Sequence, residues 1–125
     1  MNGTNYFLDT NALIAFFNGN VNVGKLLSNA NLISISTISI IEFLVYKNLS
    51  QEDKDLMLDF IAEIKVIDIV ATNQSLLNSI IEIRKNYNVK LPDAIIAGSC
   101  FELNCSLITN DKNFSKIKEL AVINY

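Results

Sequence analysis

The stretch 5-NYFLDTNALIAFF-17 places a single carboxylate, Asp9, between two apolar runs. The run from Tyr6 to Leu8 is typical of a short strand, and the run from Ala12 to Phe17 is typical of a helix. A strand that passes directly into a helix indicates a fold in which the two kinds of element alternate. Because acids are rarely buried in apolar sequence without a partner, Asp9 is also the first candidate for a functional residue.

The rest of the chain continues this alternation. Further strands are expected at residues 31–36, 65–70, 106–109 and 121–125. Helices are expected at residues 23–29, 39–47, 50–64, 72–87, 92–103 and 113–120. Ser50 and Thr72 are the expected N-caps of their helices. Pro92 is expected to be the first residue of its helix, and Asn104 is expected to stop it.

This pattern predicts an α/β protein with a three-layer α/β/α sandwich around a central, mainly parallel five-stranded sheet. No linker or repeat divides the chain, so residues 1–125 are expected to form a single domain. Half of the residues are hydrophobic, which predicts that a second copy or a tight partner covers some apolar surface. No apolar window is long enough for a membrane span and no signal peptide is recognisable. We therefore expect a cytoplasmic location and no membrane partner.

The chain has no histidine. This excludes Ser-His-Asp and Cys-His nucleophile schemes and most zinc sites, so any catalysis depends on carboxylates, hydroxyls, lysines or an oxygen-bound metal. No GxGxxG or P-loop pattern is present. Cys100 and Cys105 have neither zinc-site nor CxxC spacing and are expected to be buried free thiols.

The charge of the chain argues against nucleic-acid binding through a broad basic surface. The formal net charge is −3 and the pI is about 4.8. Local basic groups remain, and they are Arg84 with Lys85 and Lys90, and Lys112 with Lys116 and Lys118. Such groups are enough for a few phosphate contacts, but they are also typical of solvated helix surfaces, which is the more common case.

Four acids occupy equivalent places in the predicted fold. Asp9 follows the first strand and Asp111 follows the fourth, while Glu42 and Asp93 lie in the first turns of helices that leave the same edge of the sheet. In open parallel sheets, ligands bind at the carboxyl ends of the strands. The four carboxylates, which come from distant parts of the chain, are therefore expected to converge on one crevice.

Each acid also has a purely structural explanation. Asp9 is suited to cap the helix that follows it, and Asp111 to form an Asx turn. Glu42 stands three residues after Ser39, as in a capping box, and Asp93 suits the positive end of a helix dipole. These roles do not explain why all four acids are embedded in strongly apolar sequence, where a carboxylate is costly unless it is paired or binds a cation.

Four carboxylates in one crevice would repel one another, and a bound divalent cation would relieve this repulsion. Oxygen ligands without His or Cys favour Mg²⁺ or Mn²⁺, and a hard metal with open water positions suits phosphoester hydrolysis. Asn11 and Thr109 stand close to Asp9 and Asp111 in the sequence and are candidates to orient carboxylates or waters.

At these residues the chain resembles the PIN domain, and in particular the VapC-type toxins of toxin–antitoxin pairs. The resemblance is carried by YFLDTNALI at 6–14, SIIEFL at 39–44, KLPDAIIA at 90–97 and LITNDKNF at 107–114. It implies Mg²⁺- or Mn²⁺-dependent endoribonuclease activity on an RNA substrate, a homodimer, and inhibition by a cognate antitoxin. It also implies that Asp9, Glu42, Asp93 and Asp111 are the catalytic, metal-binding acids, with Asn11 and Thr109 as supporting polar residues.

Two other functions remain open at this point. Asp9 followed by Asn11 superficially resembles the start of haloacid-dehalogenase phosphatases, in which an Asp is the phosphorylated nucleophile, but this leaves Glu42 without a role. A PIN-like module that binds RNA or protein without cutting is the non-enzymatic alternative. Four intact acids argue against it, because a scaffold has no need to keep costly carboxylates together.

Overall fold

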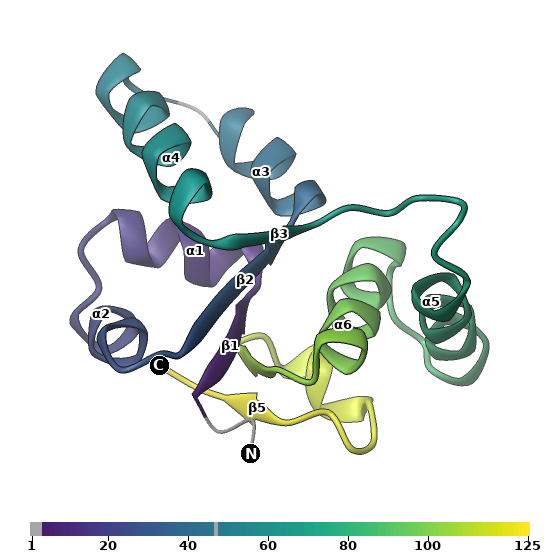
Figure 1. Ribbon diagram of the computed structural model, residues 1–125. Helices are drawn as coiled ribbons and strands as arrows, with labels where there is room; N and C mark the ends of the chain where they lie inside the picture. The colour runs from purple at the N-terminus through teal and green to yellow at the C-terminus, as the bar shows by residue number, and fades with distance from the viewer. Residues whose placement is uncertain (1–3, 47) are drawn as a thin grey trace.

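The computed structural model describes residues 4–46 and 48–125 and has a five-stranded parallel sheet at its centre (Figure 1). The strand order is β3-β2-β1-β4-β5. The strands are β1 (Asn5–Leu8), β2 (Leu32–Ser36), β3 (Lys65–Ile67), β4 (Ser106–Ile108) and β5 (Val122–Ile123). The predicted fold class is confirmed, and the first strand of the chain is the central strand of the sheet.

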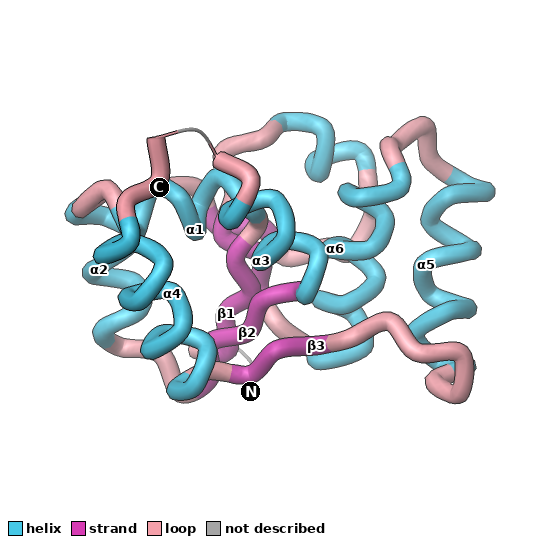
Figure 2. The backbone as a smooth tube through the Cα atoms, turned by 90° about the horizontal axis from the view of Figure 1, so that it is seen from above, coloured by secondary structure: helices cyan, strands magenta, loops and turns pink. Residues whose placement is uncertain are grey.

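Helices cover both faces of this sheet (Figures 1 and 2). They are α1 (Thr10–Phe17), α2 (Val21–Ser28), α3 (Thr37–Leu44), α4 (Gln51–Glu63), α5 (Gln74–Asn86) and α6 (Leu91–Leu103), with a 3₁₀ helix η1 (Lys112–Lys116). Residues of α5 and α6 pack in one hydrophobic core, and residues of α1, α2, α3 and α4 pack in the other. The sheet is thus the middle layer of three.

The side chains of β1 explain why its sequence is continuously apolar. Phe7 belongs to the core under α5 and α6, whereas Tyr6 and Leu8 belong to the core on the opposite face. Leu107 and Ile108 of β4 divide between the two cores in the same way. Strands buried on both faces lack the alternation of polar and apolar residues that marks half-exposed strands.

Some predicted helix boundaries are confirmed and others are wrong. Ser50 caps α4 in a capping box with Asp53, and Asn104 ends α6 in the left-handed conformation with φ 54°. Helix α5 is capped by Asn73, not Thr72, because the Asn73 side chain accepts a hydrogen bond from the backbone N–H of Leu76. Pro92 is the second residue of its helix, which begins at Leu91, one position earlier than expected.

The helix predicted at 39–47 begins earlier than expected. Its N-cap is Ser36, whose hydroxyl accepts a hydrogen bond from the N–H of Ile38 at 3.2 Å. The capping box predicted between Ser39 and Glu42 is therefore wrong, because Ser39 already lies inside the helix. Helix α3 ends at Leu44, and Lys47, where the prediction ended it, lies outside the described residues.

Several predicted elements are shorter than their apolar patterns indicate, including the last strand, which was expected at residues 121–125 and spans Val122–Ile123. Strand β3 ends at Ile67 instead of residue 70. At this end, the Thr37 hydroxyl is within hydrogen-bond distance of the Ile67 carbonyl oxygen and of the Asp68 carboxylate, which both act as acceptors. Ile69 and Val70 are consequently exposed rather than paired in the sheet. The helix predicted at 113–120 is reduced to η1, and Glu119 in this segment has φ 68°, which no helix accommodates.

The two cysteines are buried and free, as predicted. Burial is the main cause that raises the pKa of each thiol. Among residues 4–46 and 48–125, no helix is both long and apolar enough to cross a membrane.

Helices α5 and α6 approach closely at Gly98. A Cβ atom added there would lie 2.7 Å from Ile80 Cγ1 and 3.2 Å from the Ile80 backbone nitrogen. Gly98 is therefore needed for its small size, since its backbone is ordinary helix.

We expect Gly98→Ala to destabilise the fold by about 1–3 kcal/mol, because overcrowding a packed contact outweighs the better helix propensity of alanine. Gly24→Ala is the matched control, since its added Cβ meets no atom within 4 Å, and it should stabilise the fold by about 0.5–1 kcal/mol. Urea denaturation of both variants measures the difference. Equal effects of the two substitutions would contradict this account of the α5–α6 contact.

Candidate active site

The strand order defines where a ligand is expected to bind. Strands β2 and β3 lie on one side of β1, and β4 and β5 lie on the other. The order of connection therefore reverses between β1 and β4, and in open parallel sheets the crevice at the carboxyl ends of such a pair is the usual binding place. Asp9 directly follows β1, and Thr109 directly follows β4.

Asp9 is buried at this position, with 4% of its surface exposed. It is the N-cap of α1, and its Oδ1 accepts a hydrogen bond of 2.7 Å from the backbone N–H of Ala12. The predicted capping role is thus confirmed, but it uses only one of the two carboxylate oxygens. Oδ2 accepts a hydrogen bond from the hydroxyl of Thr109, which is buried as well.

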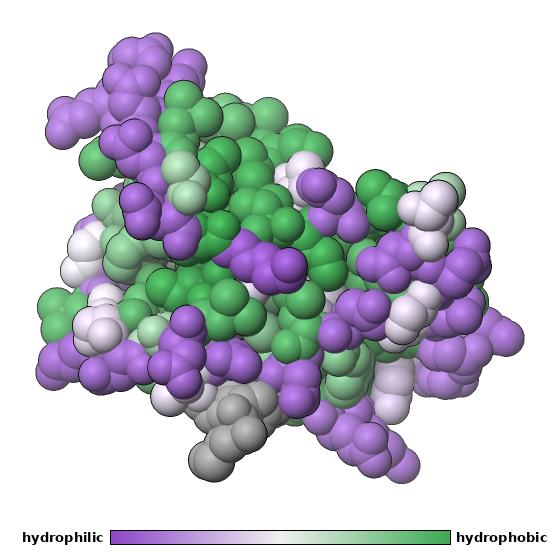
Figure 3. Space-filling view, viewed as in Figure 1, coloured by the Kyte–Doolittle hydropathy of each residue, from purple (hydrophilic) through white to green (hydrophobic). Residues whose placement is uncertain are grey.

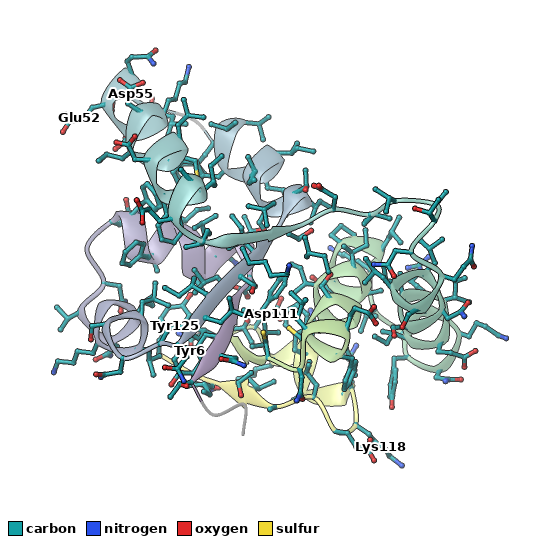
Figure 4. All side chains as sticks on the ribbon, viewed as in Figure 1. Tyr6, Glu52, Asp55, Asp111, Lys118 and Tyr125 are labelled. Atoms are coloured by element: carbon teal, nitrogen blue, oxygen red, sulfur yellow. The ribbon has the colours of Figure 1, made fainter. Side chains whose placement is uncertain are left out.

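Thr109 connects Asp9 to Asp111. While the Thr109 hydroxyl donates to Asp9, its oxygen accepts a hydrogen bond of 3.0 Å from the backbone N–H of Asp111. The Asp111 carboxylate in turn accepts from the N–H of Asn113 at 2.9 Å, so the predicted Asx turn is confirmed. In Figure 4, Asp111 lies next to α6, the helix that carries Asp93. Thr109 therefore links the ends of β1 and β4 at the switch in strand order.

Glu42 is held at the site by a residue that the sequence pattern did not identify. The Thr10 hydroxyl donates a hydrogen bond of 2.7 Å to Glu42 Oε1, and the Ser39 hydroxyl oxygen lies 3.0 Å from that of Thr10. Thr10 follows Asp9 in the chain, so the N-cap of α1 contacts the end of β4 and the first residue of α1 contacts α3. The position of Thr10 beside Asp9 was the only sequence signal, because its partners are about 30 residues away.

Asp93 lies in the first turn of α6 and is partly buried. Its charge acts on Asp9, and the charges of Asp111 and Glu42 act on Asp93. The structure thus brings all four predicted acids into electrostatic contact at one edge of the sheet. Asn11, the other predicted polar residue, is exposed in the first turn of α1.

Two of these carboxyl groups have raised pKa values. Burial is the main cause that raises the pKa of Asp9, and the charges of Asp111 and Asp93 add to it, against the hydrogen bonds from Thr109 and Ala12. Burial also raises the pKa of Asp93, followed by the charge of Asp111. The surroundings of Asp9 and of Asp93 therefore disfavour the negatively charged form of each carboxyl group.

The donor set fits a hard divalent cation. It consists of carboxylate oxygens, and the two described cysteines are buried in the hydrophobic core. Each Asp9 oxygen accepts one hydrogen bond and keeps a further lone pair for a ligand. In the part of the chain that the structure describes, no three acid or cysteine side chains are close enough to coordinate one ion in this arrangement. Glu42 accepts a hydrogen bond from the Thr10 hydroxyl, and Asp111 accepts one from the backbone N–H of Asn113.

The fold and the site define a parallel α/β protein with an acidic centre at the switch in strand order. A family model described as the PIN domain matches residues 6–120. The chain therefore belongs to the PIN domain family. PIN domains are generally nucleases that use divalent metal ions.

Solved structures that resemble the chain include toxin–antitoxin assemblies. A toxin–antitoxin complex from Klebsiella pneumoniae contains a chain of 26% identity with a TM-score of 0.78, and the match covers 94% of this chain and 95% of that chain. A chain in the crystal structure of VapBC2 from Rickettsia felis, bound to a DNA fragment of the VapBC2 promoter, matches with 28% identity and a TM-score of 0.70. The match covers 96% of this chain and 98% of that chain. DNA-bound VapBC from Salmonella typhimurium has the same fold, with 23% identity, a TM-score of 0.73 and coverage of 96% and 97%. The comparison with curated proteins gave no significant match.

We expect Asp93→Asn to stabilise the metal-free protein, by an amount that grows with pH. Because the pKa of Asp93 in the folded chain is raised above its ordinary value of 3.8, the folded chain holds this proton more tightly than the unfolded chain. Asp93 therefore favours folding most below that ordinary value, and this contribution is lost as the pH rises through the raised pKa.

Thermal melting in EDTA between about pH 4 and about pH 8 measures this difference between the variant and the wild type. Asp59→Asn, which removes an exposed acid of α4, reports the effect of changing the overall charge alone. A difference that stays constant or narrows with rising pH, or that Asp59→Asn reproduces, would contradict the prediction.

Proposed function

We propose that this chain is a metal-dependent endoribonuclease and the toxin of a toxin–antitoxin pair, and that residues 1–125 form its single domain. The observation that carries the proposal is the gathering of Asp9, Glu42, Asp93 and Asp111 at the switch in strand order of a PIN-family sheet. The VapC resemblance of the sequence and the toxin–antitoxin complexes among similar structures support the biological role. The cytoplasm is the compartment in which such a protein would meet its RNA.

We assign the four acids to one metal site for Mg²⁺ or Mn²⁺. Asp9, Glu42 and Asp93 would hold the ion directly or through waters, and Asp111 would act as a ligand or as an acceptor beside it. When bound, such an ion polarises a phosphate oxygen and lowers the pKa of its water. Burial is the main cause that raises the pKa values of Asp9 and Asp93, and the neighbouring acids add to it; a bound cation would offset both effects.

The surrounding polar residues position the acids. Thr109 fixes one oxygen of Asp9 and thereby leaves a defined direction for a ligand, and Thr10 does the same for Glu42. Asn11 is exposed at the start of α1, and its proposed role is contact with water or substrate beside the acids. These contacts are supplied by the chain itself, so they would hold the acids in place before substrate arrives.

The expected products are RNA fragments with 5′-phosphate and 3′-hydroxyl ends. Cleavage through the ribose 2′-hydroxyl commonly uses a histidine as general acid or base, and this chain has none. Attack by a water on the phosphodiester, with the 3′-oxygen as the leaving group, gives the proposed ends and needs only oxygen ligands and a cation.

An antitoxin is the proposed partner at a hollow next to Glu42. The hollow has a volume of about 690 Å³ and is lined by apolar and polar residues of α1, α3, the segment after α3 and the start of α4. They include Ile14, Phe17, Phe43, Val45 and Leu49. A partner segment seated there would cover Glu42 and hinder access to the acids.

A second apolar surface supports a homodimer. Ile41 of α3 and Ile69 after β3 line one smaller hollow, and both are exposed, at 58% and 44%. Figure 3 shows apolar residues gathered on this side of the molecule, over α3 and β3. Exposed apolar clusters of this kind mark protein interfaces, and we assign this one to the contact with a second copy.

Asp9→Asn and Asp93→Asn are each expected to reduce metal-dependent RNA cleavage at least about 100-fold, because a bound ion contributes several kcal/mol of charge stabilisation. The test incubates purified, partner-free protein with mixed cellular RNA in Mn²⁺ or in EDTA and maps the new RNA ends. Asp59→Asn is the control that keeps the site intact.

Discrete cuts that need Mn²⁺, carry 5′-phosphates and disappear in both site variants would support the nuclease. No cleavage by the folded, metal-loaded protein would instead favour a module that binds RNA or protein without cutting it.

Ile41→Glu is expected to convert a homodimer of 14.0 kDa chains to monomers, because it places a charge in the proposed apolar contact. Light scattering after size-exclusion chromatography gives the mass directly. Val21→Glu is a matched control, since Val21 is 67% exposed on α2, far along the chain from this surface. A wild-type monomer, or a dimer that survives Ile41→Glu, would contradict the assignment.

A further inference from the structure

A polar hollow of about 350 Å³ lies beside Asp93. Its charged lining consists of three cations from different elements and one acid. These are Arg84 of α5, Lys90 at the start of α6, Lys116 of η1, and Asp93 itself. The amides of Asn88 and Asn113 complete its polar wall.

Two of the cations are held in place by the loop between α5 and α6. Arg84 Nη1 donates to the Val89 carbonyl oxygen at 2.8 Å, and Lys116 Nζ donates to the Asn88 carbonyl oxygen at 3.0 Å. Each bond uses one N–H, whereas a guanidinium has five and an ammonium has three. The remaining donors are available to a ligand, and the side chains need little reordering to meet it.

The charge of this hollow opposes that of the whole chain. Three cations and one ionised acid give a net charge of +2, in a protein whose formal net charge is −3. Lys90 and Lys116 lie close enough to Asp93 for their charges to act on it. The positive charge is therefore concentrated at the border of the acidic site, where a polyanion would have to pass.

We propose that this hollow binds a backbone phosphate of single-stranded RNA next to the phosphate that is cut. Arg, Lys and Asn side chains are the usual donors to nucleic-acid phosphates, and such contacts fix the position of a strand without reading its sequence. Asp93 lies both in the hollow and in the acidic site, so a strand that crosses the site would reach the hollow with an adjacent phosphate. This assignment rests on the proposed ribonuclease function.

The test measures binding of a fluorescent, mixed-sequence RNA 12-mer in EDTA, where no cleavage occurs. Lys90→Gln and Lys116→Gln remove a charge each, and Gln at position 116 keeps an N–H donor for the Asn88 carbonyl oxygen. At about 0.1 M salt, each lost phosphate contact should weaken RNA binding about fivefold, so the double variant should bind about 25-fold more weakly. In the double variant, the slope of the logarithm of the binding constant against the logarithm of the salt concentration should be smaller in magnitude by about 1.4.

Lys118→Gln is the matched control for overall charge. Lys118 is two residues from Lys116, is absent from the lining of the hollow, and points away from the molecule in Figure 4. The Lys118→Gln variant should bind RNA like the wild type. Lys116→Arg, which keeps the positive charge that Lys116→Gln removes, should also bind with wild-type affinity.

Wild-type affinity in the double variant, or an equal loss in Lys118→Gln, would overturn the proposal. So would a selective loss of binding to an acidic peptide instead of RNA. RNA binding that depends on the hollow in a protein that never cuts RNA would reject the nuclease and keep the phosphate site, so the two proposals fail separately.

Discussion

The hydrogen bond between the buried carboxylate of Asp9 and the hydroxyl of Thr109 is the contact on which the site depends. It joins the ends of β1 and β4, which are 100 residues apart in the chain and adjacent in the sheet. The other oxygen of Asp9 caps α1 by accepting a hydrogen bond from the backbone N–H of Ala12. The following residue, Thr10, donates a hydrogen bond to Glu42 of α3. One buried acid thus orders the strand pair at the switch and the helix that brings the next acid.

This arrangement places charge where the fold least tolerates it. Desolvation and neighbouring acids both raise the pKa of Asp9, so the metal-free protein carries an unfavourable interaction at its centre. Strain of this kind is typical of functional sites, where stability is lower than the packing allows. The cations around Asp93 and the acids at the switch divide the local charge into two zones, one suited to a divalent cation and one suited to phosphate. Under the proposed function, this division is how an acidic chain would bind RNA without a broad basic surface.

The fold class and the edge of the sheet at which the four acids lie could be predicted from the sequence, because both follow from local patterns. The metal-binding role of the acids stays a prediction. Apolar runs fixed the strands, and the position of each acid just after a strand or at a helix start fixed its edge of the sheet. Contacts between distant residues were beyond such patterns. The spacing of Ser39 and Glu42 satisfied a capping box, yet Ser36 provides the cap and Ser39 faces Thr10. Likewise, Arg84, Lys90 and Lys116 form one hollow only because the α5–α6 loop packs on η1.

The most direct test of this account is a crystal structure of the protein soaked in Mn²⁺, with anomalous diffraction recorded to locate the ion. The account predicts a peak at the carboxyl end of β1, about 2.1 Å from carboxylate oxygens of Asp9 and Asp93 or bridged to them by water, and near Glu42. A fully loaded crystal with no peak there, or with Mn²⁺ only at other surface acids, would contradict the claim that the four carboxylates are gathered to hold a metal.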